Sequence, residues 1–147
     1  MKQFFKELLE YNYHFNQELG DVFASETGKA SEKSFKLYNH ILNAHNIWNS
    51  RIEGSQTAIG VWDIQPIAAC KEIDKRNYED SLRILDNFDL ELIIDYTTMR
   101  GDKFRNRLRD IVFHIVNHGT YHRGQIATEF RQSGLTPLVS DFVLYKR

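Results

Sequence analysis

The sequence contains few of the residues that interrupt regular structure or cross-link a chain. Its 147 residues include two prolines, eight glycines and one cysteine. The lone cysteine, Cys70, excludes an internal disulfide, which fits a reducing compartment. Because proline and glycine are the residues that most often end helices, their scarcity leaves room for long helical stretches.

The sequence also lacks an excess of charge of one sign and any long apolar run. Its 19 basic and 20 acidic residues give a net charge of -1, which offers no electrostatic footprint for nucleic acid or an anionic membrane. No apolar run approaches the roughly 20 residues that cross a bilayer. Charges scattered through residues 1–15 are unlike a signal peptide. We therefore expect a cytoplasmic protein that binds neither nucleic acid nor membranes.

The composition is that of a globular protein. Hydrophobic residues make up 41% of the chain and charged residues 27%, so disorder is not expected. Ten phenylalanines, seven tyrosines and two tryptophans supply bulk for a sizeable core. A chain of this length has room for one domain, and we expect residues 1–147 to form it.

Apolar periodicity and end signals predict two helices in the first half of the chain. Apolar residues at spacings of three and four indicate an amphipathic helix near residues 2–23. The polar residues 25–29 are expected to form a loop. A second helix is predicted to begin at an N-cap, either Ser31 or Ser34, and to stop before Gly54.

The second half of the chain predicts two more helices and a short extended segment. Pro66 suits the first turn of a third helix, where its missing N–H costs nothing. Residues 93–97, followed by a turn at 101–102, suggest a short hairpin or extended connection. A fourth helix carries an apolar stripe over 108–130, and the charged run 103–110 is expected to be a solvated face near its start. Four amphipathic helices must bury their stripes against one another, so the predicted fold is an all-α four-helix bundle.

Three histidines at four-residue intervals form the most informative pattern, on the predicted fourth helix. Residues four apart share a helix face, and His118 and His122 fall on the stripe expected to face the core, with His114 one turn earlier. A pair at i and i+4 brings two imidazoles onto one metal ion. His40, on the predicted buried face of the second helix, is the candidate third ligand. His45 lies about 140° further around that helix, so it does not easily share the direction of His40.

Three neutral imidazoles leave a coordination position open, which is the arrangement of a catalytic metal. Histidines that are simply hydrogen-bonded in the core are the alternative interpretation. The glutamate of an H-E-x-x-H protease motif is replaced by Gly119, whose mid-helix position hints at a close approach of backbone or ligand. Cys70 lacks an identifiable base and is expected to be a buried, inert thiol. Trp48 and Trp62 could line a pocket but are expected in the core.

Two segments resemble the DinB family of metalloenzymes. The string FHIVNHGTYHRGQIATEFRQSGLTP, followed by Asp141, resembles the C-terminal signature of that family. The string LYNHILNAHNIWNSRI resembles its first histidine region, with Trp48 eight residues after His40. The resemblance spans nearly the whole chain. It implies a four-helix bundle of up-down-down-up topology, usually a homodimer, with a divalent metal, Zn or Ni, held by three histidines.

Carried over position by position, the ligands of the family fall on His40, His118 and His122, the same residues that periodicity selects. His114 then corresponds to a neighbour of the ligands. Arg123 and Gln125 complete an HRGQ string and would either support the ligands or pack helices together.

The resemblance also implies an activity. Some relatives are metal-dependent S-transferases that join a low-molecular-weight thiol, such as bacillithiol or mycothiol, to an electrophile. The leading hypothesis is such a transferase, acting on a small-molecule substrate with the thiol as cosubstrate. Hydrolysis by metal-bound water is a second hypothesis. A non-catalytic bundle that binds metal or dimerises is the third.

Overall fold

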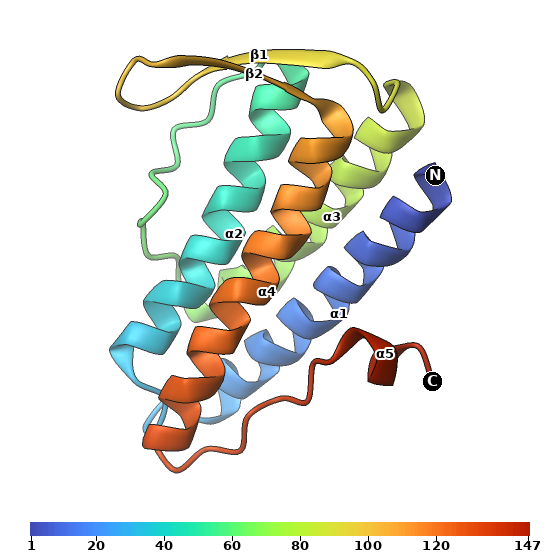
Figure 1. The fold of residues 1–147 in the computed structure, drawn as a ribbon. Coiled ribbons are helices and arrows are strands. Elements are labelled where there is room, and N and C mark those ends of the chain that lie inside the picture. Colours follow the sequence, from blue (N-terminus) through green and yellow to red (C-terminus); the bar gives the residue numbers. More distant parts are fainter.

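Five helices and one two-stranded hairpin make up the computed structural model, which describes residues 1–147 (Figure 1). The elements are α1 (Lys2–Ser25), α2 (Glu32–Glu53), α3 (Ile67–Asn87), β1 (Ile93–Thr97), β2 (Lys103–Arg107), α4 (Leu108–Gln132) and α5 (Phe142–Tyr145). The four long helices lie side by side, and the hairpin crosses one end of them (Figure 1). The predicted mostly helical fold with a hairpin before the last long helix is confirmed. None of the helices combines the length and apolar character needed to cross a bilayer.

The ends of α2 show how the sequence sets helix boundaries. Ser31 is the N-cap, because its hydroxyl accepts a hydrogen bond from the Ser34 backbone N–H at 3.0 Å. Gly54 follows the last turn with a φ of 68°, a left-handed conformation that glycine adopts without strain. Of the two predicted caps, Ser31 is therefore the correct one, and the predicted stop at Gly54 is confirmed.

The prediction for the charged run 103–110 was wrong in part. Residues Lys103–Arg107 form strand β2, all of it exposed, and pair antiparallel with β1. Gly101, with a φ of 87°, lies in the turn between the two strands. Helix α4 begins only at Leu108, where the apolar stripe starts. Pairing with β1 thus overrides helix formation in a segment that has no apolar face to bury.

Helix α5 was not predicted. It has only four residues, Phe142–Tyr145, which is too short to display helical periodicity. Phe142 and Tyr145 pack their rings edge-on against Tyr11 of α1, with ring centroids 5.2 and 5.5 Å apart. These contacts hold the C-terminal segment against the long helices.

Two clusters of buried apolar side chains occupy the space between the long helices. One lies toward the hairpin and includes Leu85 and Val112, and the other lies toward the far end and includes Phe23 and Phe130. The most extensive helix interfaces join α2 to α4 and α1 to α3. Residues of α2 and α4 therefore meet along much of their length, which matters for the histidines that these two helices carry.

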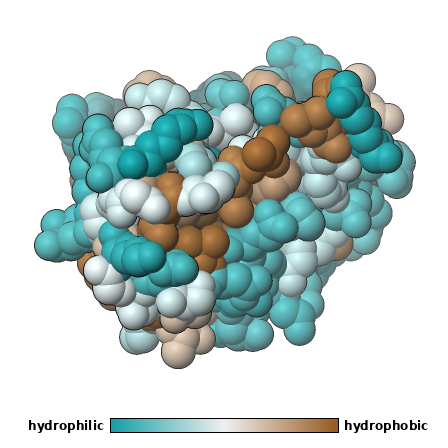
Figure 2. Space-filling model, turned by 90° about the horizontal axis from the view of Figure 1, so that it is seen from below, coloured by the Kyte–Doolittle hydropathy of each residue, from teal (hydrophilic) through white to brown (hydrophobic).

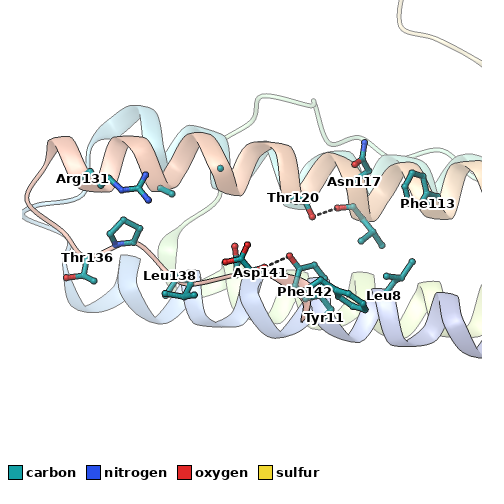
Figure 3. Close-up of a pocket in the computed structure, with 16 residues that line it drawn as sticks. Leu8, Tyr11, Phe113, Asn117, Thr120, Arg131, Thr136, Leu138, Asp141 and Phe142 are labelled. Carbon is teal, nitrogen blue, oxygen red and sulfur yellow. Dashed lines mark hydrogen bonds between the residues drawn. The ribbon is translucent and has the colours of Figure 1, made fainter. Parts of the chain in front are cut away.

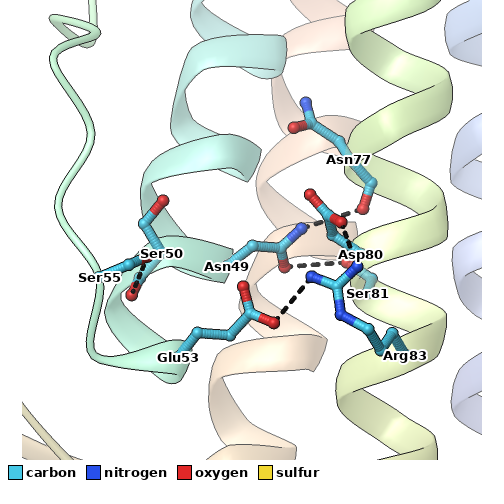
Figure 4. A network of polar contacts seen from close by, with 8 residues as sticks. All are labelled: Asn49, Ser50, Glu53, Ser55, Asn77, Asp80, Ser81 and Arg83. Carbon is cyan, nitrogen blue, oxygen red and sulfur yellow. Dashed lines mark hydrogen bonds and ion pairs between the residues drawn. The ribbon is translucent and has the colours of Figure 1, made fainter.

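Helices α2 and α3 are joined by a polar network (Figure 4). The buried Asn49 amide donates to the Asn77 carbonyl oxygen at 2.9 Å, and Ser81 donates to the Asn49 side-chain oxygen at 2.9 Å. At the surface Arg83 bridges Glu53 of α2 and Asp80 of α3 at 2.8 and 2.7 Å. Because buried amides need partners at fixed positions, this network sets the register between the two helices.

Gly119 of α4 lies against buried side chains of α1 and of its own next turn. A Cβ at this position would stand 2.4 Å from the Asn12 side-chain oxygen and 2.9 Å from an Arg123 guanidinium nitrogen. The atoms that approach Gly119 belong to side chains and not to the backbone.

Gly119→Ala is expected to lower the free energy of unfolding by about 1–3 kcal/mol, since the added methyl group displaces buried, hydrogen-bonded side chains. Urea unfolding measures this change. Gly124→Ala is the matched control, because it lies on the same helix with nothing within 4 Å of the new Cβ, and it is expected to stabilise by roughly 0.5–1 kcal/mol. Equal effects of the two substitutions would show that the close approach is unimportant.

Candidate metal centre

Three histidines from two helices meet in a single cluster. His118 Nε2 lies 3.0 Å from His40 Nε2 and 3.1 Å from His122 Nε2. One ring nitrogen from each residue lies within 4.8 Å of the other two, a grouping that could hold a metal ion. His118 and His122 come from successive turns of α4, and His40 comes from the facing side of α2. The sequence-predicted trio is thus brought together.

Hydrogen bonds to the outer nitrogens orient two of the three rings. His40 Nδ1 lies 3.2 Å from the Val61 carbonyl oxygen, and His122 Nδ1 lies 2.6 Å from the Gln125 side-chain oxygen. Because these oxygens accept, each Nδ1 carries the proton and each Nε2 presents a lone pair. Metal-binding histidines in proteins are commonly held in this way.

The three ring nitrogens are arranged to bind a divalent cation rather than to hydrogen-bond one another. Two lone pairs, from His40 and His122, point at one nitrogen of His118, and a neutral imidazole carries a single N–H. One N–H cannot make two full hydrogen bonds. Ligand nitrogens around a tetrahedral zinc ion at about 2.0–2.1 Å lie about 3.3 Å apart, close to the two separations found here.

Burial keeps two of the three clustered histidines neutral, which is the form that binds a metal ion. Burial, together with the neighbouring rings of His122 and His40, lowers the pKa of His118 to about 3. Burial also lowers the pKa of His40, against the opposing effect of its bond to Val61. Both rings are therefore neutral at pH 7, and only neutral imidazole binds a metal ion.

Aromatic side chains form the walls of the site. Trp62, which is 57% exposed, stacks on the His40 ring with centroids 4.0 Å apart, and Tyr121 contacts the His122 ring at 5.0 Å. Trp48 packs against His114 at 5.2 Å. The expectation of two core tryptophans holds for Trp48, which packs against the apolar cluster toward the hairpin. It was wrong for Trp62, which the loop after α2 carries to the surface beside the histidines. The cluster is therefore close to solvent.

The other candidate residues lie outside the cluster. His114 packs its ring 5.5 Å from that of His118 without joining the three, as the resemblance implied. His45 is buried, and its Nε2 lies 2.7 Å from the Ser81 hydroxyl on α3. Cys70 is buried, and burial raises the pKa of its thiol to about 11, so it is inert as predicted.

His45 should make stability depend on pH. Burial lowers its pKa from the ordinary 6.5 to about 3, so the unfolded chain binds a proton that the folded protein excludes. Stability is therefore lost as the pH falls from 6.5 toward 3, by up to about 1.4 kcal/mol per pH unit from this group. Urea unfolding of His45→Gln between pH 7 and 4 should show a shallower loss than that of the wild type.

The largest groove lies elsewhere on the molecule. It has a volume of about 750 Å³ and runs between α4 and the C-terminal segment, over Leu8 and Tyr11 of α1 (Figure 3). None of the three clustered histidines lines it. Seen from the lower end of Figure 1, apolar side chains form a diagonal stripe across the surface (Figure 2). Val139 and Val143 of the C-terminal segment are 68% and 65% exposed.

Comparisons with known proteins identify a family that the chain resembles over its whole length. The model of the DinB family matches residues 1–147, which is the whole chain. Protein DinB of Bacillus subtilis (strain 168) is 42% identical over 41 residues. That segment covers 28% of this chain and 24% of the relative, so the match spans about a quarter of the curated relative's length.

Proposed function

The chain belongs to the DinB family, and from this membership and the three-histidine cluster we propose that it is a metal-dependent enzyme that transfers a low-molecular-weight thiol to an electrophile. The observation that carries the proposal is the convergence of three side chains, since the Nε2 atoms of His40 and His122 lie 3.0 and 3.1 Å from that of His118. Three imidazoles around a cation leave a coordination position for a substrate.

Each residue of the site has a part in this proposal. His40, His118 and His122 would hold a Zn or Ni ion, and Val61 and Gln125 would fix the rings of two of them. A bound divalent cation lowers the pKa of a thiol and so supplies the nucleophilic thiolate. The exposed Trp62 covers one side of His40, so it would limit the direction from which the electrophile approaches.

Thiol transfer is favoured over hydrolysis by the composition of the cluster. The grouped residues are histidines alone, with no aspartate or glutamate among them. Many metal-dependent hydrolases use a nearby carboxylate to take a proton from water, whereas a thiol bound to a cation loses its proton readily at neutral pH. The transferase is therefore the function that we propose.

The fold and assembly of the family complete the proposal. We propose the four-helix bundle of up-down-down-up topology, which the long connection between α2 and α3, running back along α2 in Figure 1, favours. We also propose a homodimer, for which the exposed apolar residues of the C-terminal segment offer a surface. Sedimentation equilibrium of the purified chain measures its molar mass in solution, and we expect the value of a dimer. A monomer at micromolar concentration would contradict it.

Metal content and turnover together test the proposed function. Mass spectrometry of purified, untagged protein is expected to find about one Zn or Ni ion per chain. The loaded protein is expected to join bacillithiol or mycothiol to an alkyl halide, and chelator is expected to stop this reaction. No stoichiometric metal, even after reconstitution, would refute the proposal. If the protein binds one metal ion per chain but transfers no thiol, the proposed activity is wrong and a non-catalytic metal-binding bundle is favoured.

Treatment with a chelator also distinguishes a metal with an open coordination position from a metal that the fold requires. Both buried apolar clusters lie in the helix interfaces, so the fold does not depend on the histidines for its core. We expect chelator to remove the metal while the far-ultraviolet circular dichroism spectrum stays unchanged. Unfolding on chelation would indicate a structural metal, because the free energy of metal binding would then be needed to keep the chain folded.

A further inference from the structure

A second cavity lies beside the histidine cluster, between α2 and the turn of the hairpin. Its volume is about 420 Å³, and its lining includes Trp48 and Arg51 of α2 and Met99 and Arg100 of the turn. Val61 joins it to the cluster, because this residue lines the cavity and its carbonyl oxygen binds His40. A small molecule in this cavity would therefore lie near His40, on the other side of Val61.

Arg51 is a positioned cation with no anionic partner. Its guanidinium lies over the Trp48 ring at 4.6 Å and near the Tyr96 ring at 5.3 Å, and the residue is half-buried. Unlike Arg83, Arg105, Arg107 and Arg109, it forms no salt bridge, and neither does Arg100. Stacking uses the face of the guanidinium and leaves the N–H groups at its edge free to donate.

The charges of the lining favour an anionic guest. Arg51 and Arg100 contribute two positive charges and Asp102 one negative charge, so the cavity is cationic overall. A guanidinium edge matches the two oxygens of a carboxylate or phosphate. Trp48, Ile47 and Met99 supply apolar surface for the carbon chain that would carry such a group.

We propose that this cavity binds the oxyanion end, a carboxylate or a phosphate, of the small molecule that reacts at the three-histidine site, and that Arg51 recognises it. The inference rests on the proposed function for the identity of the reacting site. The binding itself, however, can be measured without turnover. Arg51 would then act as a specificity-determining residue that positions the substrate.

Titration of the purified protein with hexanoate and with hexyl phosphate tests the proposal, and hexanamide serves as the neutral probe. The Trp48 indole N–H signal in NMR spectra reports binding in the cavity. We expect saturable binding of at least one anion and at least tenfold weaker binding of hexanamide. Equal binding of the neutral amide would overturn the proposal, because it would show that only the apolar lining matters. Preference for one anion identifies the headgroup.

Substitutions locate the bound anion. Arg51→Met is expected to weaken binding about tenfold, with Arg51→Lys intermediate because it keeps the charge but loses the planar fork. Arg131→Met removes an exposed arginine that lines the other groove, so it should bind as the wild type does. His118→Ala should also keep anion binding. Wild-type affinity in both Arg51 variants, or loss of binding in His118→Ala, would overturn the assignment, whereas the proposed function is judged separately by metal content.

Discussion

Replacing His118 with alanine is expected to abolish stoichiometric metal binding while the helices stay folded. His118 is the central member of the cluster, because its Nε2 lies 3.0 Å from that of His40 and 3.1 Å from that of His122. Removing a residue that merely orients a ligand costs roughly 10–100-fold in metal affinity, so the loss of a ligand should exceed about 100-fold. The side chain is only partly buried, and we expect a change in stability within about 1 kcal/mol.

Competition titration with a chelating dye measures the metal affinity, and circular dichroism measures the fold. His114→Ala is the matched control, because His114 lies one turn earlier on α4 and contacts His118 without joining the cluster. It should bind the metal within about tenfold of the wild type. If His118→Ala retains one metal ion per chain, these three histidines are not the ligands. If His118→Ala and His114→Ala lose the metal equally, His114 contributes to metal binding as much as His118 does, and the ligands are not limited to His40, His118 and His122.

The site was predictable from sequence where it depends on helix geometry. The i and i+4 spacing of His118 and His122 fixes their shared face within one helix, and no tertiary information is needed to see it. His40 required a further step, from its place beside Leu37 and Ile41 to the face of α2 that meets α4. That step succeeded because both helices bury those faces in one interface.

The surroundings of the histidines were beyond sequence reasoning for a physical reason. Val61 and Trp62 lie in the connection 54–66, which has no periodic pattern, and its path depends on tertiary contacts such as the hydrogen bond from the Asn43 amide to the Asp63 carbonyl oxygen at 2.7 Å. Residues 103–107 were assigned to the start of the fourth helix for a similar reason, since pairing with β1, and not their own sequence, makes them extended. Local rules describe helices well and describe loops and pairings poorly.

Neighbouring residues of α4 contact different helices. His122 faces α2 and joins the histidine cluster, whereas Arg123 faces α1 and is 4% exposed. Gln125 then returns to the cluster side, where it binds His122. The HRGQ string therefore combines both roles that the sequence left open. Arg123 packs helices together, and Gln125 supports a candidate ligand.

The second large effect is expected from Arg123→Met, which should lower the free energy of unfolding by about 2–5 kcal/mol. The Arg123 guanidinium donates to the side-chain oxygens of Asn12 at 2.7 Å and Asn16 at 2.9 Å. Asn16 in turn donates to Asp74 of α3 at 2.9 Å, so the network ties three helices together. Methionine fills a similar volume but leaves two buried amide oxygens without donors, and each costs roughly 1–3 kcal/mol.

The effect of Arg123→Met should also grow with pH, because Asp74 shares the network. Burial raises the pKa of Asp74 to about 7, against hydrogen bonds from Gln17 and Asn16 and the charge of Arg123, which lower it. A raised pKa gives stability that is fully present below the ordinary 3.8 and is lost as the pH rises through 7. Without Arg123 the pKa of Asp74 rises further, so the variant loses more stability than the wild type between pH 5 and 8.

Urea unfolding of Arg123→Met at pH 5 and pH 8 tests both parts of this expectation. Arg131→Met, two turns later on α4 and exposed, should change stability by no more than about 0.5 kcal/mol at either pH. A loss below about 1 kcal/mol in Arg123→Met would mean that desolvation of the guanidinium offsets its hydrogen bonds, as happens for some buried ions. A large loss of unfolding free energy that is equal at both pH values would assign the effect to the Asn12 and Asn16 side chains alone. It would show that the pKa of Asp74 does not depend on Arg123. Because Arg123 adjoins His122 while facing another helix, the folded fraction of the variant should still bind metal, which separates the stability of the fold from the chemistry of the site.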